Sequence, residues 1–273
     1  MDLIFLLSLC SGFFIYDYLA TPEELSPEEV VKIPLSEGGA DDDITEEVVK
    51  IPLIEDGAED DTTEGQDGID RIWGGAGDDS IEGQDGIDRI FGGAGDDTIS
   101  GGAGDDSIFG NEGSDLVIGG AGDDFLRGLA DDDLLIGGSG NDILHGDTGN
   151  DTLVGVSGIT QALQEGADTL HGGSGNDDIW SGSGDVVDTG KGSDTLNLGE
   201  WVDPQNPVEI IDFNTSEDII VFHYSGEVDP VATFDETDGK PVLLIDDSIV
   251  AKFPNNALSD FSEGDNVVYL VSS

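Results

Sequence analysis

The sequence predicts an all-β solenoid in which short strands stack in successive layers, and three observations lead to this fold. A nine-residue unit recurs about fourteen times between residues 65 and 197. Each unit ends in a polar, aliphatic, polar triplet, which is the period of a strand that is buried on one face. The 42 glycines and the hydrophobic share of 36% are poor material for one conventional core, so a quasi-linear fold is favoured.

Ten of these units follow one another without a break. Residues 65–73 read GQDGIDRIW, residues 74–82 read GGAGDDSIE, and the pattern continues to residue 154. The segment 155–162 (GVSGITQA) then interrupts the array, which resumes at residue 163, includes one unit shortened by one residue (181–188), and closes with TGKGSDTLN. We expect the insertion to loop out without breaking the stack, because long surface insertions cost little closure entropy.

The aliphatic residues predict the register of the stack. If successive units lie on opposite sides of a flattened spiral, residues 18 apart in the sequence lie above one another. One ladder then holds Ile72, Ile90, Ile108, Leu126 and Leu144, and the other holds Ile81, Ile99, Val117, Leu135 and Leu153.

The other half of each unit has the chemistry of a ligand cage. Glycine at positions one, two and four predicts a tight turn with positive φ at all three positions, and position six is aspartate in nearly every unit. Stacked at about 4.7–4.9 Å per layer, such carboxylates repel one another unless cations lie between them. Oxygen ligands in a flexible loop suit Ca²⁺ better than Mg²⁺, and the scarcity of Cys and His excludes zinc.

The unit resembles the G-G-x-G-x-D-x-U-x nonapeptide of repeats-in-toxin (RTX) proteins, which form the parallel β-roll. The resemblance covers about half of the chain and implies that Ca²⁺ ions lie between consecutive turns on one edge, held by backbone carbonyls and position-six aspartates. The implied metal ligands are Asp70, Asp79, Asp88, Asp97, Asp106, Asp115, Asp124, Asp133, Asp142, Asp151, Asp168, Asp177, Asp185 and Asp194. About ten ions are expected, because Leu129 and Asp131 replace motif glycines in one unit and another unit is shortened.

Two segments precede the array. Residues 1–20 contain an apolar run at 3–16 that is about the length of a signal-peptide core and short for a membrane span. We therefore expect either a signal segment or a membrane anchor, and in the second case residues 3–16 would associate with the membrane. Residues 21–64 form an acidic linker in which EEVVKIPL occurs twice, 18 residues apart. The single cysteine, Cys10, cannot form an internal disulfide, which leaves metal as the stabiliser outside the cell.

Residues 198–273 are expected to form a small β-rich cap, because the end of a solenoid needs a cover. Strand-like stretches occur at 208–213, 218–224, 242–245, 249–253 and 267–271. The segment IIDFNTSEDIIVFHY is similar to the C-terminal region of serralysin-type RTX proteins, and this resemblance implies an uncleaved signal read by type I secretion machinery.

The function classes follow from charge and motifs. With 62 acidic and 8 basic residues, the net charge of −54 excludes nucleic acid as a partner and favours cations. Neither H-E-x-x-H nor G-x-S-x-G occurs, and His145, His171 and His223 are scattered, so we expect no enzyme. A secreted or cell-surface calcium-binding protein is the main hypothesis. The alternatives are an adhesive or ice-binding protein, which the irregular residues at position seven disfavour, and an accessory repeat module of an exported calcium-dependent enzyme.

Overall fold

The computed structural model describes residues 30–33, 47–50, 53–55, 57–155, 166–226, 229–256, 259, 261 and 268–272. The chain divides into two compact units, Met1–Lys50 and Ile51–Ser273. In the first unit, β1 (Val30–Ile33) pairs antiparallel with β2 (Glu47–Lys50). The two copies of the duplicated segment, expected to be parts of an extended linker, therefore pair with each other. The predicted segment 1–20 lies outside the described residues, among which no helix is long and apolar enough to cross a membrane.

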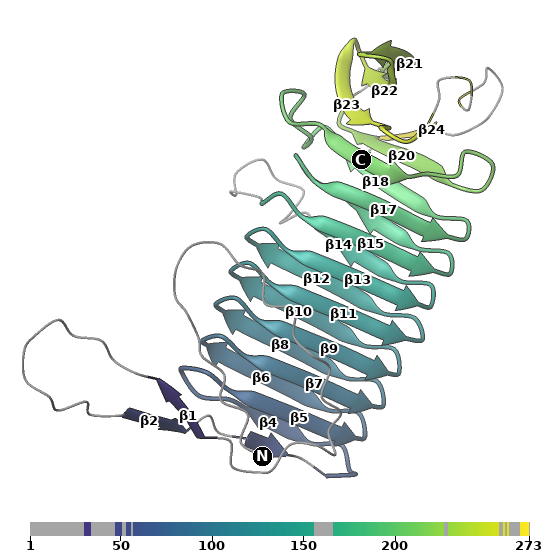
Figure 1. The fold of residues 1–273 in the computed structure, drawn as a ribbon. Helices are drawn as coiled ribbons and strands as arrows, with labels where there is room; N and C mark the ends of the chain where they lie inside the picture. Colours follow the sequence, from purple (N-terminus) through teal and green to yellow (C-terminus); the bar gives the residue numbers. More distant parts are fainter. Residues whose placement is uncertain are drawn as a thin grey trace, which may run out of the picture. The chain divides into compact units, whose positions relative to one another are not determined.

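The second unit is built from two sheets of stacked strands (Figure 1). The first sheet contains β3 (Leu53–Glu55), β5 (Arg71–Ala76), β7 (Arg89–Ala94), β9 (Ser107–Glu112), β11 (Phe125–Ala130), β13 (Ile143–Thr148), β15 (Thr169–Ser174), β17 (Val186–Lys191), β19 (Val208–Asp212), β23 (Ser248–Lys252), β22 (Lys240–Ile245) and β21 (Ala232–Thr237). The second sheet contains β4 (Thr62–Glu64), β6 (Ser80–Asp85), β8 (Thr98–Ala103), β10 (Leu116–Ala121), β12 (Leu134–Ser139), β14 (Thr152–Val154), β16 (Asp178–Trp180), β18 (Thr195–Gly199), β20 (Ile219–Tyr224) and β24 (Val268–Ser272). The chain alternates between the sheets, so each pair of consecutive strands forms one layer. This is the predicted parallel β-roll.

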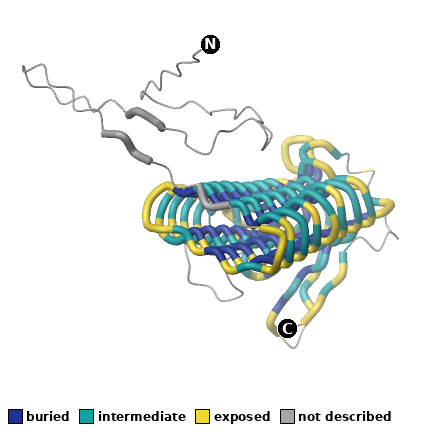
Figure 2. Tube along the Cα trace, turned by 90° about the horizontal axis from the view of Figure 1, so that it is seen from below, coloured by how far each residue is buried: buried dark blue, intermediate teal, exposed yellow. Residues whose placement is uncertain are grey.

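The predicted register is confirmed. Ile72 pairs with Ile90 and Ile90 with Ile108 in the first sheet, while Ile81 pairs with Ile99 in the second. All ten residues of the two predicted ladders are 2% exposed or less. Figure 2 shows buried positions along the strands of both sheets and exposed positions gathered at the turns. The core is thus a narrow double ladder with one aliphatic side chain per turn.

The insertion leaves both ladders intact. The strands on either side of it stay in register, with Leu144 paired to Leu170 and Leu153 paired to Ile179. The main chain also keeps its spacing, because Gly155 N–H donates to Trp180 O at 2.9 Å. Residues 156–165 lie outside the described residues, and the stack continues past them as expected.

The parallel stack extends beyond the predicted boundaries of 65 and 197. At its start, β3 pairs with β5 and β4 with β6, so the last part of the predicted linker belongs to the roll. At its end, β19 pairs with β17 and β20 with β18. Strand pairing and one inward aliphatic residue, such as Ile210 or Ile220, continue the stack where the motif glycines have ended.

The cap covers the end of the first sheet with an antiparallel meander, β21 to β23. Phe213, Phe234, Phe253 and Phe261 pack together beneath it, with ring centroids 4.3–6.3 Å apart. The five predicted strand-like stretches are all strands, and β21 was not predicted, because four of its six residues are acidic or threonine. The cap thus has an aromatic cluster where the roll has one aliphatic side chain per turn.

Candidate metal centre

Each turn between the sheets spans positions one to six of a unit, for example Gly74 to Asp79. Positions two and four take left-handed backbone, with φ of +109° at Gly75 and +130° at Gly77. The expectation of positive φ at position one was wrong: in the described turns no position-one glycine has this conformation. Position one is glycine for space instead, because a Cβ on Gly74 would lie 2.6 Å from Asp79 Oδ2 and 2.5 Å from Gly92 O.

This crowding defines a cradle in every turn. The position-six carboxylate folds back over the position-one glycine of its own turn. The position-one carbonyl oxygen of the next layer lies close to the same glycine, as Gly92 O does to Gly74. Carbonyl oxygens at positions two and four also face the next layer, since a Cβ on Gly93 would meet Gly75 O and one on Gly95 would meet Gly77 O. Each turn therefore presents one carboxylate and several backbone oxygens toward its neighbour.

The turn at residues 128–133 keeps this geometry, although its site was expected to be impaired. Leu129 and Asp131 adopt φ of +88° and +75°, so the backbone follows the glycine pattern. Left-handed backbone costs a non-glycine residue about 1–2 kcal/mol, which the rest of the stack supplies. Asp133 is 3% exposed and its Oδ1 accepts the Asp115 N–H at 2.9 Å, as in the other turns.

The fourteen predicted aspartates form two columns, and each is 3% exposed or less. The first edge, where turns lead into the first sheet, carries Asp70, Asp88, Asp106, Asp124, Asp142, Asp168 and Asp185; the second edge carries Asp79, Asp97, Asp115, Asp133, Asp151, Asp177 and Asp194. Within a column, Oδ1 of each aspartate accepts the backbone N–H of the aspartate one layer earlier, at 2.8–3.0 Å. The sequence therefore placed these residues on the correct edges and in the correct order.

The second oxygen of most of these carboxylates is buried without a hydrogen-bond donor. This applies to Oδ2 of Asp79, Asp88, Asp97, Asp106, Asp115, Asp124, Asp133, Asp142, Asp151, Asp177 and Asp194. A buried polar atom without a partner carries a large desolvation cost, and in a native protein it calls for an ion or water. Eleven such oxygens in register indicate a repeated ligand.

The raised pKa values of these aspartates also indicate a missing positive charge. Burial raises the pKa of Asp115 from 3.8 to about 7 and that of Asp133 to about 8, and the stacked neighbouring aspartates add repulsion. Burial likewise raises the pKa of Asp97 to about 6 and that of Asp194 to about 7. Ionised carboxylates in these positions are therefore costly unless a proton or a cation neutralises them.

The donor set fits Ca²⁺. Among the described residues, no three His, Cys, Asp or Glu side chains converge in a way that could hold a metal ion. A cation in the columns would thus have to take one carboxylate per turn and complete its shell with backbone carbonyls. Such mixed oxygen ligation is characteristic of Ca²⁺, whereas transition metals favour nitrogen or sulfur ligands.

A second ladder, at position five, was not predicted. Asp78 Oδ1 accepts the N–H of Asp96, and Asp96 Oδ1 accepts that of Ser114, each at 2.9 Å. On the first edge, Asp105 Oδ1 accepts the Asp123 N–H at 2.9 Å. These side chains reach toward the following layer, whereas the position-six side chains reach toward the preceding one. The frequent Asp or Asn at position five was the available sequence signal.

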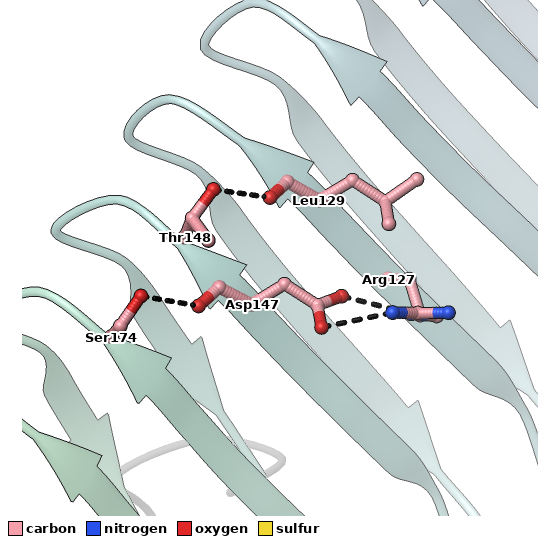
Figure 3. A network of polar contacts seen from close by, with 5 residues as sticks. All are labelled: Arg127, Leu129, Asp147, Thr148 and Ser174. Atoms are coloured by element: carbon pink, nitrogen blue, oxygen red, sulfur yellow. Dashed lines mark hydrogen bonds and ion pairs between the residues drawn. The ribbon is translucent and has the colours of Figure 1, made fainter.

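Side chains other than the aspartates of positions five and six also link the layers (Figure 3). Arg127 on β11 forms a two-point ion pair with Asp147 on β13, with Nε 2.8 Å from Oδ2 and Nη2 2.9 Å from Oδ1. The hydroxyls of Thr148 and Ser174 donate to the carbonyls of Leu129 and Asp147 at 2.9 and 3.3 Å. Because a carbonyl oxygen has two lone pairs, these position-two carbonyls can still face a cation.

The three histidines are surface residues of the two sheets. His145 and His171 stack at 4.5 Å on the first sheet, and His171 Nδ1 lies 3.3 Å from Asp188 Oδ2. Burial lowers the pKa of His145 to about 4, so it is neutral at physiological pH. His223 stacks against Trp180 at 4.9 Å on the second sheet.

The repeat itself has a counterpart among known protein families. The RTX calcium-binding nonapeptide repeat matches in four copies, at residues 56–90, 82–117, 118–153 and 164–187. No curated protein matches the chain. Among solved structures, the extracellular lipase LipA from Serratia marcescens aligns at 19% identity and a TM-score of 0.28, covering 81% of this chain and 42% of the lipase. Over residues 56–153 and 164–187, the array of this chain is therefore similar to the RTX calcium-binding nonapeptide repeat.

Proposed function

We propose that this chain is a secreted or cell-surface calcium-binding protein whose repeat array folds around about ten Ca²⁺ ions. The observation that carries the proposal is the set of eleven buried Oδ2 atoms that have no donor. When bound, Ca²⁺ supplies the positive charge that the stacked carboxylates lack. The position-six aspartates and the carbonyls at positions two and four are the groups that would hold it.

The charge balance supports a folding role for the ion. One inward aliphatic residue per unit contributes about 1.5–3 kcal/mol, whereas ordering nine backbone residues costs about 1–2 kcal/mol each. Burial alone is therefore insufficient. About ten divalent ions add 10 × 2 = 20 positive charges and bring the net charge from −54 to about −34. Because the array needs these ions to fold, the free energy of calcium binding contributes directly to the free energy of folding.

Export follows from the same balance. A chain that stays unfolded where calcium is scarce passes a narrow channel more easily, and it folds where calcium is abundant. We propose type I secretion through the C-terminal region, with no catalytic role for the chain. We propose that the segment at residues 3–16 is a signal or a membrane anchor.

The test is a calcium titration of the full chain followed by calorimetry and far-ultraviolet circular dichroism. We expect about ten sites and a cooperative gain of β-sheet signal as they fill. Two sites or fewer, or a β-sheet signal that is independent of calcium, would refute the proposal. Magnesium at the same concentration is the matched control and should give little folding, because it demands a stricter octahedral shell.

A further inference from the structure

Position one is glycine in every described turn from Gly65 to Gly172, and the last two turns of the array are different. Ser181 and Thr189 occupy position one there, and both are 0% exposed. Each hydroxyl lies beside a buried aspartate at the end of one column, Asp185 on the first edge and Asp218 on the second. A small hydroxyl residue thus replaces glycine only where a column ends.

At Asp185 the protein itself fills the coordination that other turns leave open. Oδ2 accepts the Ser181 hydroxyl at 3.1 Å and the Gly182 N–H at 2.5 Å, and Oδ1 accepts the Asp168 N–H at 3.0 Å. The unit is one residue shorter, and Oδ2 reaches the donors of its own positions one and two. At the other end of this column, in a unit of full length, Asp70 Oδ2 likewise accepts the position-two N–H of Gln66 at 2.5 Å. Asp185 was predicted as a calcium ligand, yet its Oδ2, the atom that eleven other turns leave without a donor, accepts two hydrogen bonds here.

Two carbonyl oxygens of this turn, at positions one and three, also accept hydrogen bonds from side chains. Trp201 Nε1 donates to Ser181 O at 2.9 Å, and Asn206 Nδ2 donates to Ser183 O at 3.3 Å. Both donors come from residues 200–207, which form the next turn on the first edge and carry no nonapeptide motif. An ion at this level would have a binding turn on one side only.

The second edge ends in the same way at Asp218, a residue that the sequence pattern did not single out. Asp218 precedes β20, is 2% exposed, and continues the column, because its Oδ1 accepts the Asp194 N–H at 3.1 Å. Its Oδ2 accepts the Asn214 N–H at 2.7 Å and lies 3.1 Å from Thr189 Oγ1, whose single hydrogen it shares with the Asp212 carbonyl oxygen at 2.8 Å. Asp194, one layer earlier, still has an Oδ2 without a donor.

We propose that Asp185 and Asp218 are metal-free end sites, at which hydroxyl and amide donors take the place that Ca²⁺ takes in the preceding layers. The inference rests on the proposed function and specifies where each column of ions stops. The last layers of the roll join a cap that has no motif turns, so an ion at this level would have ligands from one turn only. Hydrogen bonds from the protein satisfy each terminal carboxylate instead.

The test compares isosteric variants of neighbouring aspartates in the full chain. Bound calcium per chain is measured by elemental analysis after equilibrium dialysis, and the melting temperature is measured on the loaded protein. Asp177→Asn, which changes a carboxylate whose Oδ2 has no donor, should lose about one ion. Asp185→Asn and Asp218→Asn should keep the parental number of ions and melt several degrees lower, because an amide nitrogen would face existing donors.

Two milder variants test the same point if the aspartate variants do not fold. Thr189→Val removes the hydroxyl at nearly constant volume and should lower the melting temperature at unchanged ion count, whereas Thr189→Ser should restore it. Ser181→Ala should behave like Thr189→Val. An ion lost from Asp185→Asn, or melting that is unaffected by Thr189→Val and Ser181→Ala, would overturn the end sites.

Failure of the end sites and failure of the proposed function give different results. If the parent protein binds two ions or fewer, the calcium columns do not exist and both proposals fall. If the parent binds about ten ions and Asp185→Asn loses one as Asp177→Asn does, only the end sites are refuted.

Discussion

Acid should replace calcium in holding the array folded. The perturbation is to remove calcium at pH 8, where the stacked aspartates are ionised, and then to lower the pH to 5. Without the ion, the folded state must either carry these charges in buried positions or bind protons. We expect the calcium-free chain to be unfolded at pH 8 and to regain β-sheet structure as the pH falls.

The magnitude follows from the raised pKa values. For Asp115 the difference between 3.8 and about 7 corresponds to about 4 kcal/mol, and for Asp133, at about 8, to nearly 6 kcal/mol. The folded state holds protons more tightly than the unfolded chain, so its stability is greatest at low pH and is lost as the pH rises through about 6 to 8. One such group is therefore comparable with the lower end of the total stability of about 5–15 kcal/mol that a domain has.

The assay is far-ultraviolet circular dichroism of calcium-free protein at pH 8, 7, 6 and 5, with limited proteolysis at each pH. Calcium-loaded protein is the control and should show the β-sheet signal throughout at saturating calcium. Sedimentation at pH 5 distinguishes folding from aggregation. The reasoning is wrong if calcium-free protein at pH 8 keeps the full β-sheet signal and resists protease, or if acid reduces that signal.

Three further predictions concern single features. Replacing Asp97 and Asp115 by alanine should raise the calcium concentration at the folding midpoint, because each side chain supplies a buried oxygen without a donor, and a titration with an unchanged midpoint would contradict this. Deleting residues 156–163 leaves Gly155 three positions before Gly166, the spacing of positions one and four, and should change the calcium midpoint little, since both ladders continue past the insertion. A large loss of affinity would show that the insertion belongs to the core. Leu129→Gly should stabilise the loaded protein by about 1 kcal/mol because it removes a left-handed non-glycine residue, and a lower melting temperature would show that the leucine side chain contributes more than the strain costs.

The register and the two aspartate columns could be predicted because the period of nine residues determines both. With one inward residue per unit, as at Ile72 and Ile90, only an 18-residue layer keeps the aliphatic side chains between the sheets. The reason for glycine at position one could not be predicted. In the sequence it is indistinguishable from the glycines at positions two and four, and only the positions of Asp79 Oδ2 and Gly92 O show that it is required for space.

The ends of the roll were missed because the turn motif stops before the strands do. Strand pairing needs an inward aliphatic residue and a free backbone edge, which Ile210 and Ile220 provide without glycine-rich turns. The sequence signal for Asp218 was its position directly before the strand residues Ile219 and Ile220. This is the same aspartate, any residue, aliphatic order as in the repeat, but it lacks the preceding glycines.

The placement of charge explains why calcium should act on all layers together. The outer face of the first sheet carries all three arginines of the chain, with Arg89 5.1 Å from the centre of the Phe91 ring, and this ring stacks on Phe109 at 4.9 Å. The buried aspartates stack at the two edges instead, where the position-five and position-six ladders hold each turn to both of its neighbours. An ion that orders one turn also fixes the oxygens that the next ion needs. Filling of the columns should therefore be cooperative, and the number of consecutive layers should determine the steepness of the calcium titration.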